Sequence, residues 1–180
     1  MKINQDKELA KAIVVEIIRQ AGGTLENKTN LYKAFYHSHL WFARKNTGYL
    51  SNWPIVRMPN GPGIDNFDNL LGELIAEGFL KTQQVKKGGR SAFKFVASKK
   101  QLSPGLLPEG AVDAIREGVA EVKGKTAAQV SDASHNRAWR AAPNGGEMNI
   151  YADLLTEEEH AHLVGEFRKA SKVVDEIWGN

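Results

Sequence analysis

Residues 58–98 read MPNGPGIDNFDNLLGELIAEGFLKTQQVKKGGRSAFKFVAS, and this stretch decides the fold. Its first part carries apolar residues at helical spacing, which predicts a helix over about residues 64–77 that Gly78 ends. Its second part alternates between apolar and polar residues around a glycine turn, which predicts a β-hairpin over about residues 79–97. A helix followed by a hairpin with a basic turn is the local arrangement of a winged helix.

The residues just before this helix predict a strand and a turn. Trp53-Pro54 favours extended backbone, because the residue before a proline avoids the helical region. We therefore expect residues 55–58 to pair with the hairpin as a third strand. The stretch 60–63, Asn-Gly-Pro-Gly, should form a turn, with Pro62 in the first turn of the following helix, where a missing N–H costs nothing.

Helical patterns flank this centre on both sides. Residues 6–21 and about 30–46 predict two helices, the second capped by Thr29 or Asn30 and rich in aromatic residues. We expect this aromatic helix to fill the core; the alternative is an exposed platform on which bases stack. Residues 109–123 predict another helix, and Thr156 with Glu159 forms a capping box at the start of the last one.

These elements predict an α+β fold that is mainly helical. A winged-helix-like core with a small antiparallel sheet would occupy residues 6–100, and additional C-terminal helices would occupy residues 108–178 of a single domain spanning residues 1–180. The 180 residues are enough for one sizeable core, and a content of 42% apolar and 25% charged residues is typical of a globular protein.

The composition also excludes several classes of protein. The chain has no cysteine, so disulfides, thiolate metal sites and a cysteine nucleophile are excluded. The N-terminal residues lack the apolar core of a signal peptide, and no apolar run of about 18 residues predicts a membrane span. We expect a cytoplasmic protein that does not enter a membrane.

Charge is distributed unevenly along the chain. Residues 1–100 carry 16 Lys and Arg against 8 Asp and Glu, whereas residues 101–180 carry 8 against 13. The hairpin is basic, and this gives a possible contact with nucleic acid or an acidic partner through Lys81, Lys86, Lys87, Arg90 and Lys94. The alternative is a solvated hairpin whose lysines protect an edge strand from pairing.

A DNA-binding regulator that uses this basic wing is the second functional hypothesis. The helix predicted at residues 64–77 opposes it, because that helix carries four acidic residues and no Lys or Arg. Phosphates would repel such a helix, so only a contact through the wing survives.

No motif predicts an enzyme, a metal site or a cofactor site. Ser134-His135 is the best-placed polar pair, yet adjacent residues rarely meet as nucleophile and base. We expect His135 to be a buried histidine that ties a helix end to a neighbouring carbonyl. His160 and His162 would diverge around a helix, so we expect no metal there.

Several short motifs together resemble the Panacea, or SocA-like antitoxin, domain of bacteria and their phages. They are Leu-Tyr-Lys-Ala-Phe-Tyr at residues 31–36, Asn-Gly-Pro at 60–62, Ser-His-Asn-Arg-Ala-Trp at 134–139 and Ile-Tyr at 150–151. The resemblance covers about residues 8–155. The chain departs from it at Gly63, where the family often has a β-branched residue, and in the glutamate-rich segment 156–178.

The resemblance implies a non-enzymatic antitoxin. Such domains bind and neutralise a cognate toxin protein, and some members act as adaptors for a protease. The motif residues would then be architectural, with Gly61-Pro62 setting the entry of a helix and Trp139 filling the core. The residues to which the resemblance assigns this role are Tyr32, Asn60, Gly61, Pro62, Ser134, His135 and Trp139.

Overall fold

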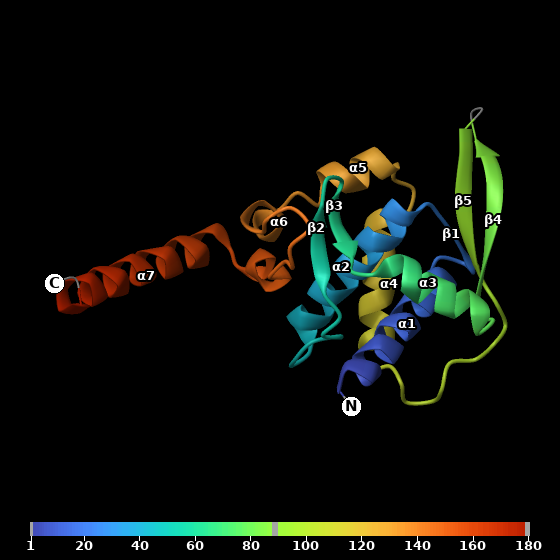
Figure 1. Ribbon diagram of the computed structural model, residues 1–180, viewed down its shortest axis with the longest axis horizontal. Helices are drawn as coiled ribbons and strands as arrows, with labels where there is room; N and C mark the ends of the chain where they lie inside the picture. Colours follow the sequence, from blue (N-terminus) through green and yellow to red (C-terminus); the bar gives the residue numbers. More distant parts are fainter. Residues whose placement is uncertain (1, 88–89, 179–180) are drawn as a thin grey trace.

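The computed structural model describes the backbone of residues 2–87 and 90–178, and the side chains of residues 6–85 and 93–178. Within these residues the fold is α+β and mainly helical, as predicted (Figure 1). The elements are α1 (Lys2–Gln20), β1 (Thr24–Glu26), α2 (Lys28–Lys45), β2 (Ile55–Met58), β3 (Gly61–Ile64), α3 (Phe67–Ala76), β4 (Leu80–Lys87), β5 (Arg90–Ala97), α4 (Ala111–Val122), α5 (Ala127–Asp132), α6 (Arg137–Ala141), the 3-10 helix η1 (Ile150–Leu154) and α7 (Glu157–Trp178).

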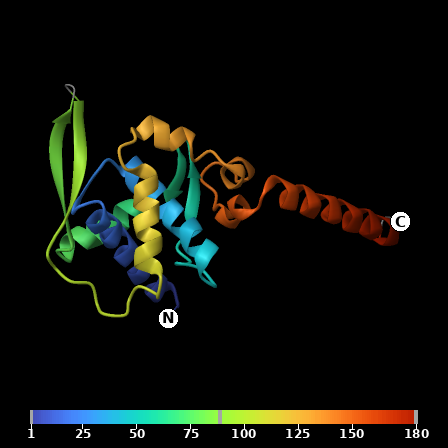
Figure 2. The same cartoon turned by 180° about the vertical axis from the view of Figure 1, so that it is seen from behind.

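Helices α1, α2 and α4 form the centre of the molecule. Helix α1 contacts both other helices, α3 and strands β1 and β5, so apolar residues cover nearly its whole circumference. Ile13, Val14, Ile17 and Ile18 are all fully buried. The view from behind shows α4 lying across this centre (Figure 2).

Helices α2 and α4 approach closely because α4 carries Gly118 at their contact. A Cβ atom built at Gly118 would lie 2.6 Å from the backbone nitrogen of Ser38 and 2.8 Å from the carbonyl oxygen of Ala34, and it would also contact Ser38 Oγ. Carbon atoms in contact prefer separations of about 3.5–4.0 Å, so only a glycine permits this spacing.

The main sheet has the strand order β1-β5-β4 and is antiparallel. The hairpin β4–β5 is confirmed, and it pairs from Leu80 opposite Ala97 to Lys87 opposite Arg90. Its third strand is β1, a three-residue segment that pairs with β5. The prediction that residues 55–58 supply this strand is wrong. The winged-helix assignment itself stays a prediction with which this strand order is compatible.

Strand β2 pairs instead with β3 in a separate two-stranded hairpin. Pro62 therefore lies in a strand opposite Arg57, and the prediction that it begins a helix is wrong. A proline is tolerated there because Arg57 makes its backbone hydrogen bonds with Gly145 and Gly146, so no N–H is needed at position 62. Helix α3 begins only at Phe67, after Asn66 with φ of 49°.

Helix α2 fills the core, as predicted. Tyr36 and Phe35 are fully buried, and Phe42 is almost so. Its N-cap is Asn27, whose side chain accepts a hydrogen bond from the Asn30 N–H, so the expected caps at Thr29 or Asn30 are wrong. His39 is buried between the Phe35 carbonyl and the Ser51 hydroxyl, each 2.8 Å away, and burial lowers its pKa to about 4.

The C-terminal third begins with α4, α5 and α6 packed on the core and ends in a helix that leaves it. Thr156 and Glu159 form the predicted capping box at the start of α7. Helix α7 then projects from the body, and no side chain in it is buried (Figures 1 and 2). Among the described residues, no helix combines the length and apolar character needed to span a membrane.

Candidate functional site

The turn between β2 and β3 accepts hydrogen bonds from buried polar side chains of α2 and α5. Lys33 of α2 donates from Nζ to the carbonyl oxygens of Asn60 at 2.5 Å and Pro62 at 2.8 Å. Ser131 of α5 donates to the same Asn60 carbonyl at 2.9 Å. We call this arrangement, with Gly61 and Ser134, the turn clamp. It joins three segments that lie up to 100 residues apart.

Gly61 is required in the turn clamp for two reasons. Its φ is +90°, in the region that side chains disfavour. A Cβ atom there would lie 2.8 Å from Lys33 Nζ and would also contact Ser134 Oγ, and both partners are almost completely buried. The backbone of the turn can therefore sit directly on α2 and α5 only without a side chain.

Lys33 is the least expected member of the clamp, because it is 1% exposed and has no carboxylate partner in the part of the chain that the structure describes. Burial disfavours the charged amine and lowers its pKa to about 7. The two backbone carbonyls accept its hydrogens without supplying a full opposite charge. Lys33 is thus a structural donor held near its titration point.

The folded protein should become more stable as the pH rises from 7 to 9. The unfolded chain binds a proton at Lys33 up to about pH 10.5, whereas the folded chain has lost most of it above about pH 7. Stability rises wherever the unfolded state binds more protons, and this difference amounts to about 2 kcal/mol over these two pH units. Urea denaturation at several pH values measures it.

The control for this prediction is Lys33→Met, which removes the titrating amine. Its stability should change little between pH 7 and 9, because the titrating amine is gone. The Pro62 carbonyl loses its donor in this variant, whereas the Asn60 carbonyl keeps Ser131. An equal slope in the wild type and in Lys33→Met would contradict the prediction.

A second polar group lies beside the clamp at the base of α6. The Tyr36 hydroxyl donates to Asp153 of η1 at 2.7 Å and accepts a hydrogen bond from the Asn136 side chain at 3.2 Å. The other carboxylate oxygen of Asp153 accepts from the Ala138 N–H at 2.8 Å, so Asp153 caps α6 from a distant segment. Burial raises the pKa of Tyr36, which keeps its phenol protonated.

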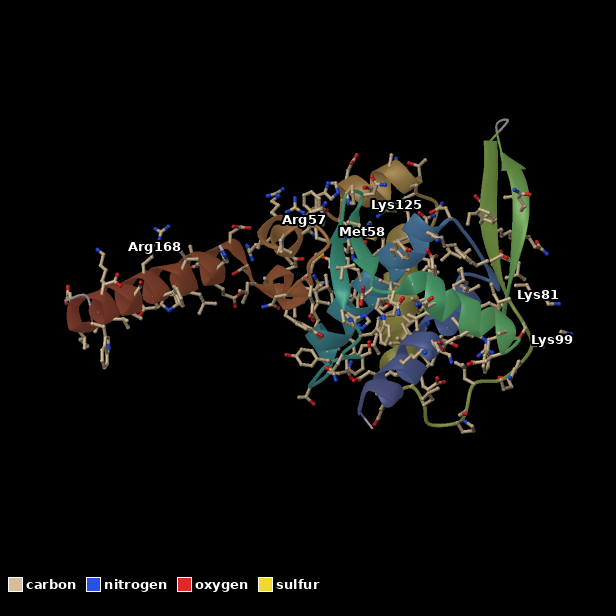
Figure 3. All side chains as sticks on the ribbon, viewed as in Figure 1. Arg57, Met58, Lys81, Lys99, Lys125 and Arg168 are labelled. Atoms are coloured by element: carbon tan, nitrogen blue, oxygen red, sulfur yellow. The ribbon has the colours of Figure 1, made fainter. Side chains whose placement is uncertain are left out.

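Trp139 lies next to these polar side chains and contacts both β2 and His135. Its indole Nε1 donates to the Met58 carbonyl at 2.9 Å, and its ring stacks on His135 with centroids 4.0 Å apart. Arg57 covers the ring at 4.2 Å from the centroid and donates to the Ala142 carbonyl at 2.6 Å. Arg57 and Met58 are labelled beside β2 in Figure 3. Trp139 is half-buried and covers the edge of these polar groups. The prediction that it fills the core is wrong.

His135 also differs from its prediction. Its buried Nε2 has no hydrogen-bond partner in the described part of the chain, so it does not tie a helix end to a carbonyl. Its ring is instead a stacking surface for Trp139. Burial and the nearby positive charge of Lys33 lower its pKa.

The structure brings six of the seven predicted motif residues together: Asn60, Gly61, Pro62, Ser134, His135 and Trp139. Tyr32 lies elsewhere, with its ring edge-on to Phe67 at 5.0 Å. Lys33 and Tyr36 were missed as site residues. The signal for Lys33 was a lysine in helical phase with the buried Tyr36 and Leu40, three and seven positions further on.

Among the described residues, Ser134 and His135 are not arranged as a nucleophile and its base. Ser134 is fully buried and donates its hydroxyl hydrogen to the Ser131 carbonyl at 2.7 Å. His135 stacks on Trp139 and makes no hydrogen bond to a carboxylate among the described residues. Both side chains therefore belong to the framework that holds these segments together.

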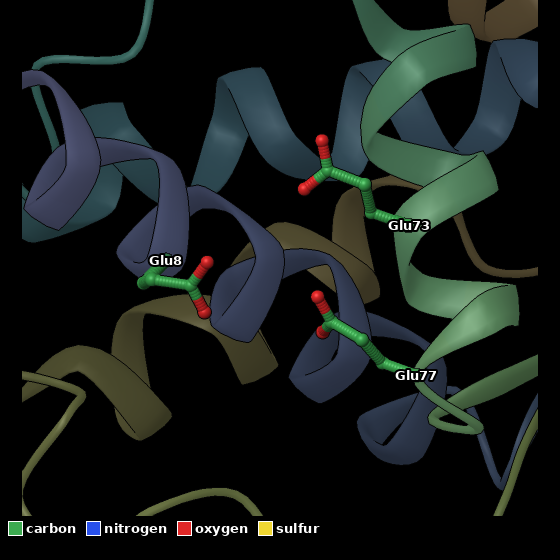
Figure 4. Close-up of side chains that lie close together, drawn as sticks. All are labelled: Glu8, Glu73 and Glu77. Carbon is green, nitrogen blue, oxygen red and sulfur yellow. The ribbon is translucent and has the colours of Figure 1, made fainter.

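Three carboxylates at another place, from Glu8, Glu73 and Glu77, lie close enough to hold a metal ion (Figure 4). The Lys11 ammonium already lies among them, 2.8 Å from Glu8, 2.6 Å from Glu77 and 3.5 Å from Glu73. Burial alone would lower the pKa of Lys11, but Glu77 and Glu8 raise it overall. This lysine supplies the positive charge that the cluster needs to join α1 to α3.

An aromatic groove lies between the segments 49–55 and 147–151. It has a volume of about 580 Å³, and its walls include Tyr49, Trp53 and Tyr151. The rings of Tyr49 and Tyr151 lie 4.5 Å apart, and Tyr49 is 60% exposed. No Lys or Arg stands among the described residues that line it. Exposed aromatic side chains of this kind are typical of protein-binding surfaces.

The predicted basic wing is described only in part. Lys81 is exposed and lies at the base of the hairpin (Figure 3). Lys94 is half-buried and lies opposite Glu26 of β1. The side chains of Lys86, Lys87 and Arg90 lie outside the described residues. Two lysines, one of them facing an acidic residue, do not by themselves make a phosphate-binding surface.

Searches against protein-family models, curated proteins and solved structures return no match for this chain. Membership of the SocA-like antitoxin family therefore stays a prediction from the motifs.

Proposed function

We propose that this protein is a non-enzymatic, antitoxin-like binding module that neutralises a cognate toxin protein and presents it to a protease. The observation that carries the proposal is the meeting of the resembling motifs in one framework. Lys33 donates to the carbonyl oxygens of Asn60 and Pro62, and Asn136 donates to the Tyr36 hydroxyl, so the segment 31–36 is bonded to both 60–62 and 134–139. An architectural role is what the resemblance implies for these motifs.

The aromatic groove is the surface that we assign to the toxin. It shares β2 and η1 with the framework, because Ile55 and Tyr151 line it while Met58 and Asp153 accept hydrogen bonds from α6 residues. The framework would thereby hold the groove in one shape before a partner arrives, which reduces the cost of ordering on binding. Tyr49 is the most exposed of the three rings that line the groove, and we assign it as the anchor.

Co-expression tests the proposed function directly. The product of the neighbouring reading frame should stop growth when it is made alone, and this protein should restore growth and bind that product. A shorter half-life of the bound product in the presence of an energy-dependent protease would support delivery to a protease. A harmless neighbour that does not bind would contradict the antitoxin proposal.

A Tyr49→Ala variant should weaken toxin binding about 10- to 30-fold, because an exposed aromatic anchor contributes about 1.4–2 kcal/mol to an interface. The matched control is Phe93→Ala on β5, which removes another exposed aromatic ring, 54% exposed, outside the groove. Isothermal titration calorimetry measures both. Equal affinity of Tyr49→Ala and the wild type would place the interface elsewhere.

DNA binding through the wing is the second candidate, and the exposed Lys81 on a projecting hairpin favours it. The acidic residues of α3 oppose it, although Glu73 and Glu77 are paired with lysines of α1. A DNA contact would give affinity for duplex DNA that falls steeply as salt is raised. Absence of binding at low salt would exclude this candidate.

A further inference from the structure

Helix α7 presents an apolar stripe that the rest of the described chain does not cover. Phe167 and Trp178 are 78% and 79% exposed, and Leu163, Val174 and Ile177 are all more than half exposed. In proteins, most of the stability of a helix comes from the packing of its amphipathic face and not from helix propensity. The stripe therefore needs a partner.

The spacing of the stripe identifies the kind of partner. The positions alternate in steps of three and four residues: His160, Leu163, Phe167, Ala170, Val174 and Ile177. This is the a and d pattern of a heptad repeat, whose period of 3.5 fits a second helix wound around the first. Charged residues such as Arg168, Lys172 and Asp175 fall at the outward positions of the same heptads, and Figure 3 shows Arg168 pointing into solvent.

We propose that α7 pairs with α7 of a second copy of this chain in an antiparallel two-helix coil. The sizes of the side chains select this arrangement. When all six positions overlap, an antiparallel pair places Phe167 opposite the partner's Ala170, and Leu163 opposite the partner's Val174. Each layer then joins a larger side chain to a smaller one, as close packing requires. A parallel pair would place Phe167 against Phe167 and Ala170 against Ala170.

The solution mass tests the pairing. Sedimentation analysis should give twice the chain mass of 19.9 kDa for the wild type. Phe167→Glu should weaken self-association at least about 100-fold, because it places two charges in the central layers. The control Lys172→Glu, on the polar face, should remain a dimer. Since no α7 side chain is buried in the body, the urea midpoint of the monomeric body should be unchanged in Phe167→Glu.

The orientation is tested with cysteines, since the chain contains none. Leu163→Cys and Val174→Cys chains should form a disulfide-linked dimer when they are mixed and oxidised, and neither should do so readily alone. A wild type that stays monomeric at about 100 µM would overturn the proposal. Rapid cross-linking of Val174→Cys with itself would overturn the antiparallel orientation. Both tests need only the purified protein, so they are independent of the proposed toxin.

Discussion

Gly118→Ala should destabilise the protein by about 3 kcal/mol, and Gly118→Val should prevent stable folding. The added Cβ would lie 2.6 Å from the Ser38 nitrogen and 2.8 Å from the Ala34 carbonyl oxygen. Both are backbone atoms of α2, so no side-chain rotation relieves the contact. Helices α2 and α4 must separate, and overpacking of this kind costs about 1–3 kcal/mol or more. Urea denaturation followed by circular dichroism measures the loss.

Gly72→Ala is the matched control, because it makes the same change inside another helix. Gly72 of α3 is exposed, and a Cβ there would meet nothing within 4 Å. This variant should be more stable than the wild type by about 0.5–1 kcal/mol, since alanine favours a helix over glycine. If both variants changed stability in the same direction and by similar amounts, close packing at Gly118 would not be the cause.

A second helix variant separates the side-chain contact from the backbone contacts at Gly118. Adding Ser38→Ala to Gly118→Ala removes the hydroxyl but leaves the nitrogen of residue 38 in place. We expect only partial recovery. Full recovery would show that the hydroxyl alone limits the approach of the two helices.

Gly61→Ala should destabilise the protein by about 2–5 kcal/mol. A side chain at φ of +90° costs about 1–2 kcal/mol, and the contact with Lys33 and Ser134 adds an overpacking cost of about 1–3 kcal/mol. The turn would move away from α2, and Lys33 would lose the carbonyls that accept its hydrogens. Thermal or urea denaturation at pH 7 measures the total.

Gly105→Ala is the control that isolates the turn clamp. Gly105 also has a positive φ, of +74°, but a Cβ there meets nothing within 4 Å. It should therefore show the backbone strain alone, about 1–2 kcal/mol. If Gly61→Ala lost no more unfolding free energy than Gly105→Ala, the contacts of the turn clamp would adjust without cost and would not hold the turn.

The motifs of the clamp were visible in the sequence, but their common location was not. Asn60, Gly61, Ser134 and Trp139 could be listed as a set only through a family resemblance. Lys33 could not be assigned, because a lysine is almost never fully buried without a partner and its partners here are carbonyls of a turn 27 and 29 residues away. The aromatic groove was equally hidden, since Tyr49, Trp53 and Tyr151 meet only after η1 has packed beside β2.

The sequence by itself determined the local elements: the periods of α3 and α4, the hairpin β4–β5, and the capping box at Thr156. Each of these depends on contacts between near neighbours, which repeat at a spacing that the chain shows directly. Only the tertiary structure decided which strand pairs with which. Residues 55–58 pair with β3 and not with the wing, since the buried donors of α2 and α5 hold the turn between them. The tertiary structure also decided that the apolar stripe of α7 lies outside the core. The core is built by other elements, among them α1, α2 and α4, and no side chain of α7 is buried in it.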